Sequence, residues 1–184
     1  PELYKKGVSL KTATMRKADS RVSFAQAKAS EYLGAVLAKV ESGLGSEPSD
    51  KIHETIFLGQ QGEVEECRTC NIFMVKRGVL FTPPGYGILD GVTRRTVIEL
   101  ACARGINVLE RVLSRHDLYN ADEVFLTYTS AEILPVREID GRKINSVCSG
   151  PLTRSLRLKY KEIVKDYVRE NLRKILKNIG DIER

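Results

Sequence analysis

The amino-acid sequence predicts an α+β domain in which a curved mixed or antiparallel sheet packs against helices. Segments with strand-like and helix-like patterns follow one another irregularly, without the strict alternation of a doubly wound sheet. The 184 residues are 42% hydrophobic and 29% charged, which is the composition of one globular domain able to bury a core. The chain contains no internal repeat and no low-complexity tract.

The first half of the chain is expected to hold a strand, a helix and several short strands. Residues 7–15 have a strand pattern, and a polar connector follows them. Helical spacing predicts a helix over 25–42 whose apolar face contains Ala29, Tyr32, Leu33, Val36, Leu37 and Val40. Further strands are expected at 54–58, 71–75 and 79–82, and we interpret these strands as antiparallel neighbours.

The second half begins with a loop rich in Pro and Gly over 83–91. A helix is predicted from Thr93 to Arg104, ending at Gly105. Strands are expected at 107–113, 124–128 and 133–139, and Asp140-Gly141 has the residues of a tight turn. The final helix should start near Pro151.

Most of the net charge of +6 lies in the last part of the chain. From Arg154 onward there are ten Lys and Arg residues against five Asp and Glu, at positions that alternate with apolar residues at helical spacing. The basic residues are therefore expected on the solvated face of a packed helix, and neither nucleic acid nor a membrane is expected as a partner. A module that binds an acidic partner through this helix is the lowest-ranked alternative.

Composition also bears on location and on the cysteines. No stretch approaches a membrane-spanning length of about 20 apolar residues, and no secretory signal opens the sequence, so a cytoplasmic location is expected.

Four cysteines are too few for a disulfide scaffold. Cys67-Arg-Thr-Cys70 has the spacing of a metal or redox pair, but no second Cys/His pair accompanies it and no metal is expected.

Five stretches, in order along the chain, carry a family resemblance. The first is Lys28-Ala-Ser-Glu-Tyr32-Leu, and the others cover residues 62–73, 78–83, 89–94 and 121–136, with 139–141 and 150–153 closing the series. In this order they resemble the fold-type IV pyridoxal-phosphate (PLP) enzymes, closest to the branched-chain amino-acid aminotransferases. The resemblance implies PLP as cofactor and the curved pseudo-barrel of the C-terminal domain in these enzymes.

The resemblance also implies roles for individual residues. Lys28 would carry the cofactor and act as general base and acid, since a lysine amine can do both. Glu66 would face the ring nitrogen, where a carboxylate keeps the ring protonated. Leu89 would pack against the ring. Tyr32 would donate to the ring hydroxyl, although a core aromatic is an equal alternative.

The phosphate and substrate contacts follow from the same resemblance. Gly91, Val92 and Thr93 open a predicted helix, whose free N–H groups and dipole favour an anion. Thr129 is implied as a second phosphate contact. Ser130 and Ala131 are implied as substrate contacts. Departures at Glu31, Cys67 and Cys70 bear on the substrate contacts more than on the cofactor contacts.

The implied activity is transamination between a branched-chain amino acid and 2-oxoglutarate in a homodimer. A D-amino-acid aminotransferase, an aminodeoxychorismate lyase and a non-catalytic fragment are the alternatives, the last because the family's smaller N-terminal domain is not found in this sequence. We divide the chain into a connector with the first strand (1–20), a cofactor-binding domain (21–160) and a C-terminal helical extension (161–184).

Overall fold

The computed structural model describes residues 2–17, 36–38, 40, 52–144 and 149–182, with side chains described as far as residue 174. The strands within these residues are β1 (Val8–Arg16), β2 (Ile52–Leu58), β3 (Val64–Cys67), β4 (Asn71–Lys76), β5 (Val79–Thr82), β6 (Val108–Glu110), β7 (Glu123–Tyr128), β8 (Glu132–Ile139) and β9 (Arg142–Lys143). The helices are α1 (Leu3–Lys6), α3 (Val92–Ala103), α4 (Arg115–Tyr119) and α5 (Pro151–Ile182).

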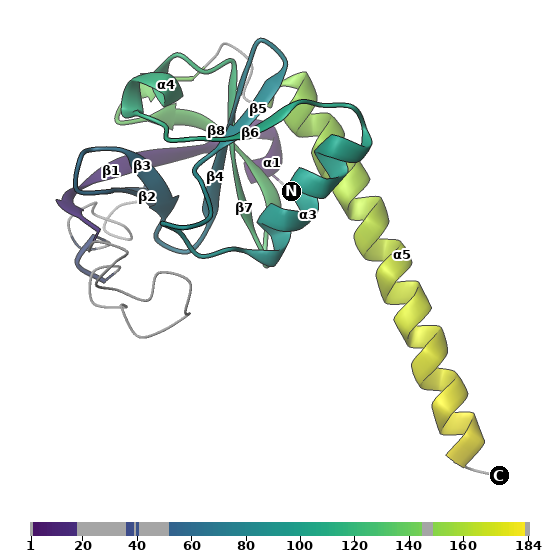
Figure 1. Ribbon diagram of the computed structural model, residues 1–184. Coiled ribbons are helices and arrows are strands. Elements are labelled where there is room, and N and C mark those ends of the chain that lie inside the picture. The colour runs from purple at the N-terminus through teal and green to yellow at the C-terminus, as the bar shows by residue number, and fades with distance from the viewer. Residues whose placement is uncertain (1, 18–35, 39, 41–51, 145–148, 183–184) are drawn as a thin grey trace.

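One curved mixed sheet contains all of these strands, which confirms the predicted fold class (Figure 1). The strand order is β3-β2-β1-β8-β7-β4-β5-β6, and β9 pairs with β8. The antiparallel pairing of β4 with β5 is as predicted. The predicted antiparallel placement of 54–58 beside these strands is wrong, because β2 pairs in parallel with β1 and antiparallel with β3. The long segment between β1 and β2 allows the crossover that a parallel pair requires.

The sheet has a hydrophobic core on each face. Along β4, Ile72 and Met74 belong to one core, while Phe73 and Val75 alternate into the other with residues of α3 and α5. Phe73 stacks on Phe125 of β7 with ring centroids 5.0 Å apart. α3 and α5 contact each other and β7, so both helices cover the same face of the sheet (Figure 1).

Part of the predicted helix over 25–42 lies outside the described residues. Residues 36–38 and 40 are helical as predicted. Ala38 is buried and forms a small cluster with Ala13 and Phe57. Val36, Leu37 and Val40, predicted to share one apolar face, are exposed.

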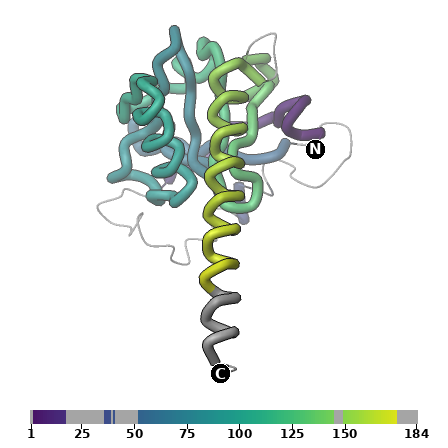
Figure 2. Tube along the Cα trace, turned by 90° about the vertical axis from the view of Figure 1, so that its right-hand side faces the viewer, coloured from purple at the N-terminus to yellow at the C-terminus, as the bar shows by residue number. Residues whose placement is uncertain are grey.

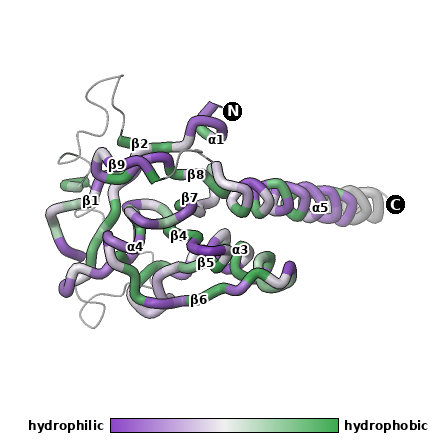
Figure 3. Tube along the Cα trace, turned by 90° about the horizontal axis from the view of Figure 1, so that it is seen from above, coloured by the Kyte–Doolittle hydropathy of each residue, from purple (hydrophilic) through white to green (hydrophobic). Residues whose placement is uncertain are grey.

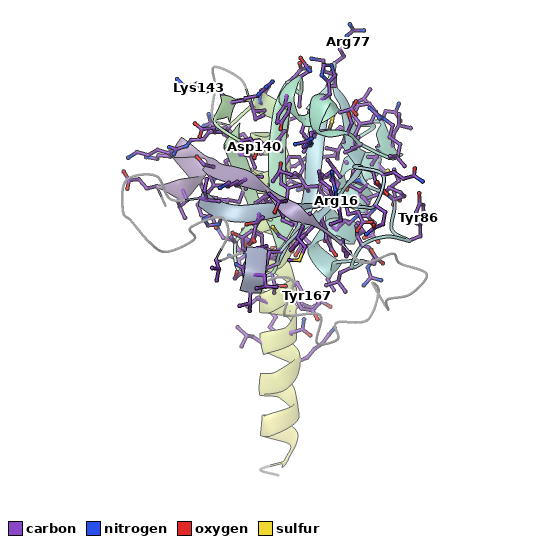
Figure 4. The ribbon with its side chains drawn as sticks, turned by 90° about the vertical axis from the view of Figure 1, so that its left-hand side faces the viewer. Arg16, Arg77, Tyr86, Asp140, Lys143 and Tyr167 are labelled. Atoms are coloured by element: carbon purple, nitrogen blue, oxygen red, sulfur yellow. The ribbon has the colours of Figure 1, made fainter. Side chains whose placement is uncertain are left out.

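The turn predicted at Asp140-Gly141 is confirmed. Both residues have positive φ, 51° and 76°, as a two-residue hairpin turn between β8 and β9 requires. The Asp140 carboxylate accepts hydrogen bonds from Thr12 N at 2.7 Å and from Tyr119 Oη at 2.7 Å. This side chain, marked in Figure 4, therefore joins the hairpin to β1 and to α4.

α5 extends well beyond the rest of the domain, as Figures 2 and 3 show. Leu156 is the last buried residue of α5 among the side chains described. Farther along the helix, Ile163, Tyr167, Val168 and Leu172 are exposed, so the prediction of a packed helix holds only for its first turns. Within the described residues, no helix is long and apolar enough to cross a membrane.

The N-terminus of α5 is fixed to the sheet by Glu123 at the start of β7. One carboxylate oxygen accepts from Leu152 N at 3.0 Å, and the other accepts from Thr153 N at 2.7 Å and from Thr153 Oγ1 at 2.5 Å. Glu123 is buried, so these bonds form where water cannot replace them. The carboxylate is the N-terminal cap that holds α5 on the domain.

We expect Glu123→Gln to lower the free energy of unfolding by about 2 kcal/mol, because a neutral amide places an N–H₂ group against helix N–H donors. Urea denaturation followed by circular dichroism measures this. Glu162→Gln removes an exposed carboxylate of the same helix and should leave the unfolding midpoint unchanged. Equal midpoints for Glu123→Gln and the wild-type chain would contradict the assigned cap.

Candidate functional site

Glu66 lies on β3, at the edge of the sheet, and both of its carboxylate oxygens have partners. Leu89 N donates to Oε2 at 3.0 Å, and Lys17 Nζ donates to Oε1 at 2.5 Å. The side chain is 14% exposed, so it is largely shielded from water. Glu66 is therefore an oriented carboxylate, unlike a freely rotating surface side chain.

Asn71, the first residue of β4, connects Leu89 to the start of α3. Its Nδ2 donates to Leu89 O at 2.8 Å, and Gly91 N donates to the same oxygen at 2.9 Å. A Cβ atom at Gly91 would overlap Asn71 Oδ1, so any larger residue here would displace the Asn71 amide from its bond to Leu89 O. No role was predicted for Asn71 from the sequence. A buried polar residue opening an otherwise apolar strand is the signal that could have identified it.

The N-terminus of α3 is free of side-chain caps. Gly91 occupies the N-cap position, and the first turn contains no acidic residue. Val92 is exposed and Thr93 is buried. The first N–H groups of a helix have no partner within the helix and carry the positive end of its dipole, so this terminus favours an anion.

The turn predicted to contact phosphate and substrate follows β7 directly. Asn71 pairs with Thr127 in the antiparallel register of β4 and β7, so Thr129 lies just beyond the end of the sheet that Asn71 begins. Thr129 and Ser130 are exposed. Tyr4 of α1 donates its hydroxyl to Ala131 O at 3.1 Å, which fixes the far side of the turn. The structure therefore gathers Glu66, Leu89 and Gly91–Thr93 closely, with the turn at the same end of β4.

Lys28 and Tyr32, the predicted catalytic lysine and its neighbouring tyrosine, lie outside the described residues. The described range that contains β1 ends at Lys17, directly after the strand. The Lys17 ammonium contacts Glu66, lies 3.3 Å from Glu65 Oε2, and donates to Gly87 O at 2.8 Å. Burial raises the pKa of Glu65, and the Lys17 charge acts in the opposite direction.

The Cys67 and Cys70 side chains are buried in the core on the side of the sheet away from α3. Burial raises the pKa of both thiols, and an un-ionised thiol is a poor nucleophile and metal ligand. Among the described residues, no group of three or more His, Cys, Asp or Glu side chains could hold a metal ion. Both cysteines are best explained as core residues.

A hydrogen bond between His53 on β2 and Tyr128 at the end of β7 lies directly before the Thr129 turn. The distance from His53 Nε2 to Tyr128 Oη is 2.8 Å. Burial is the largest cause of a lowered pKa for His53 and of a raised pKa for Tyr128. Both pKa shifts favour the uncharged forms, so a neutral imidazole and a protonated phenol share this hydrogen bond.

We expect Gly91→Ala to lower the free energy of unfolding, because the Asn71 amide must move from its bond to Leu89 O, and to cost less when Asn71→Ala is already present. The added methyl group overlaps Asn71 Oδ1 only while that amide is in place. Urea denaturation of the four chains in this double-mutant cycle measures the coupling. Gly85→Ala is the matched control, because its Cβ would meet only Arg94 Nη1 at 3.9 Å. Additive effects at Gly91 and Asn71 would contradict the close approach.

His53 predicts a pH dependence of stability. Its pKa in the folded chain is below the ordinary value of 6.5, so the unfolded chain takes up a proton first as the pH falls. Stability should therefore fall as the pH drops below about 6.5, and His53→Gln should remove this part of the slope. Denaturation at a series of pH values measures it. The exposed His116→Gln serves as control, and a slope retained by His53→Gln would refute the assignment.

Comparison with known proteins identifies the family. The model of the class IV amino-transferases matches residues 1–139. A Methanocaldococcus jannaschii protein with a provisional branched-chain-amino-acid aminotransferase name is 44% identical over 164 residues, covering 89% of this chain and 55% of that protein. The branched-chain-amino-acid aminotransferase of Pseudomonas aeruginosa is 35% identical, covering 89% of this chain and 52% of that enzyme. The chain thus spans about half the length of these relatives.

Solved structures agree in fold. The branched-chain aminotransferase of Thermoproteus uzoniensis with norvaline has a TM-score of 0.78 at 41% identity, over 88% of this chain and 52% of that one. The T.th. branched-chain amino acid aminotransferase with pyridoxamine 5′-phosphate has a TM-score of 0.80 at 34% identity, over the same shares. Since the family model covers most of the chain and the fold agrees, the chain belongs to the class IV aminotransferase family.

Proposed function

We propose that this chain is the cofactor-binding half of a PLP-dependent transaminase acting on branched-chain amino acids. The observation that supports the proposal most is the hydrogen bond that places the Glu66 carboxylate beside the segment leading to the free N-terminus of α3. PLP needs a carboxylate for its ring nitrogen and N–H donors for its phosphate, separated by the ring between them. These two groups, joined through Leu89, suit the cofactor.

Each residue then has a proposed task. When bound, PLP supplies an aldehyde that bonds to amines and a ring that withdraws electrons from the substrate. Glu66 would hold a proton on the ring nitrogen, and Leu89 would pack against the ring. The N–H groups of Val92 and Thr93 would hold the phosphate, and Gly91, which has no side chain, would let the phosphate approach the backbone closely. The hydroxyl of Thr129 would add a second phosphate contact.

The lysine and the substrate contacts complete the proposal. Lys28 would carry the cofactor and move a proton at the substrate Cα, because the lysine amine that the substrate displaces from the cofactor can act as a base. Tyr32 would donate to the ring hydroxyl. Ser130 and Ala131 would meet the substrate at the turn that Tyr4 fixes. We propose a cytoplasmic homodimer, with 2-oxoglutarate as amino acceptor.

A branched-chain substrate is favoured by the relatives, several of which are named branched-chain aminotransferases. Transamination of D-amino acids and lysis of aminodeoxychorismate are the nearest rivals, because they would need the same lysine, glutamate and phosphate contacts. These three activities differ in the handedness of the substrate and in the need for an oxo-acid acceptor. A panel of L- and D-amino acids, with and without 2-oxoglutarate, separates them.

A non-catalytic chain is the second candidate function. Its basis is the length of the chain, which covers about half of its relatives. Formation of glutamate from 2-oxoglutarate by the purified 184-residue chain would exclude the non-catalytic candidate.

We also propose that the cofactor-binding domain ends at residue 160, where the C-terminal helical extension begins. Leu156 is the last buried residue of α5 among the side chains described.

Borohydride reduction in the presence of PLP tests the proposed cofactor site directly. We expect one modified peptide, containing Lys28, in the mass spectrum of the digested chain. Lys28→Ala should abolish the label, because no other lysine would be held beside the aldehyde. Lys11 lies exposed on β1, and Lys11→Ala should leave the label in place. Labelling spread over several lysines, or unchanged in Lys28→Ala, would contradict the assignment.

A further inference from the structure

We propose that Lys17 is a positioning residue that holds the Glu66 carboxylate in the orientation the ring nitrogen needs. The proposal rests on the function proposed above, since Glu66 matters to chemistry only if it meets the cofactor. Lys17 would not touch the cofactor or the substrate itself. It would act through Glu66 and through the loop that leads to α3.

The Lys17 side chain connects two separate segments at one point. Its Nζ lies 2.5 Å from Glu66 Oε1 and 3.3 Å from Glu65 Oε2, both on β3, and donates to Gly87 O at 2.8 Å. Glu66 Oε1 and Gly87 O accept hydrogen bonds from this ammonium group, and Glu65 Oε2 forms an ion pair with it. Gly87 belongs to the loop that presents Leu89, so Lys17 holds the loop and the carboxylate together.

The backbone of Lys17 is also fixed, which makes the side chain a firm anchor. Lys17 N donates to Leu58 O at 2.9 Å, and Gln60 Nε2 donates to Lys17 O at 2.5 Å. These bonds tie the residue to the end of β2. The side chain is 13% exposed, so the contacts with both carboxylates form largely out of water.

Neutralising two adjacent carboxylates is the physical reason for a cation here. Glu65 and Glu66 are consecutive on a short strand, and both approach the same ammonium group. Without Lys17, the two carboxylates would repel each other at a partly buried site, and Glu66 would lose the partner of Oε1. Glu66 would then turn towards water, which breaks its bond to Leu89 N as well.

The first test uses the cofactor-free chain, so it does not depend on the proposed function. Amide hydrogen exchange of Leu89 N reports the bond to Glu66 Oε2. We expect Lys17→Met to speed this exchange by about tenfold or more, since the bond is to a charged group. Lys17→Arg should retain the protection, and Lys11→Met, a change at an exposed lysine of β1, should not affect it. Circular dichroism establishes that each variant is folded, and Lys17→Gln replaces Lys17→Met should the latter fail to fold.

The second test asks whether the effect reaches the ring nitrogen. Affinities are measured for PLP and for its 1-deaza analogue, which lacks that nitrogen. Lys17→Met should weaken PLP binding by about tenfold while leaving binding of the analogue nearly unchanged, and Lys17→Arg should restore the difference. If Lys17 had only a structural role, Lys17→Met would lower the affinity for both ligands equally.

The outcomes separate the two proposals. Unchanged exchange at Leu89 in Lys17→Met overturns the positioning role, whatever the chain binds. Equal loss of affinity for PLP and the analogue also overturns it. A wild-type chain that binds neither ligand contradicts the proposed function, while the exchange measurement still decides whether Lys17 holds Glu66.

Discussion

The hydrogen bond from Leu89 N to Glu66 Oε2 is the contact on which the candidate site depends. It joins an edge strand of the sheet to the segment that opens α3. Together with the Lys17 contacts to Glu66 and Gly87, it holds the carboxylate in place relative to the helix N-terminus. A site for a ligand with a basic ring nitrogen at one end and an anion at the other needs the two ends held at a fixed separation.

The strand β4 and the two hydrophobic cores hold the contact between Leu89 and Glu66 in place. Asn71 begins β4 and binds the carbonyl of Leu89, so the loop is fixed to an interior strand of the sheet as well as to its edge. β4 itself is held by both cores, through Ile72 on one face and Phe73 on the other. Interiors packed on both faces of a strand resist displacement, so the positions of Glu66 and the α3 N-terminus are determined by the core.

The sequence predicts local structure better than it predicts pairing. The start of α3 and the Asp140-Gly141 turn follow from residues adjacent in the chain, and both are confirmed. The partner of β2 depends on the long crossover from β1, which no local pattern encodes, and the prediction for it is wrong. The extent of packing along α5 is missed for the same reason, because an apolar face shows that burial is possible without showing what covers it.

The same distinction between local and long-range information applies to the residues of the candidate site. The roles of Glu66, Leu89 and Gly91 come from the family resemblance, and the structure adds that these residues contact one another or a shared neighbour. Lys17 and Asn71 carry no motif of their own. They matter because the fold brings them to Glu66 and Leu89 from distant parts of the chain.

The proposed chemistry depends above all on Glu66 holding the ring nitrogen of the cofactor in its protonated form. The most direct measurement is the ¹⁵N NMR spectrum of PLP labelled at the ring nitrogen, bound to the wild-type chain and to Glu66→Gln. We expect the shift of a protonated ring nitrogen in the wild-type chain and of an unprotonated one in Glu66→Gln. The same ring-nitrogen shift in both chains would contradict this role of Glu66.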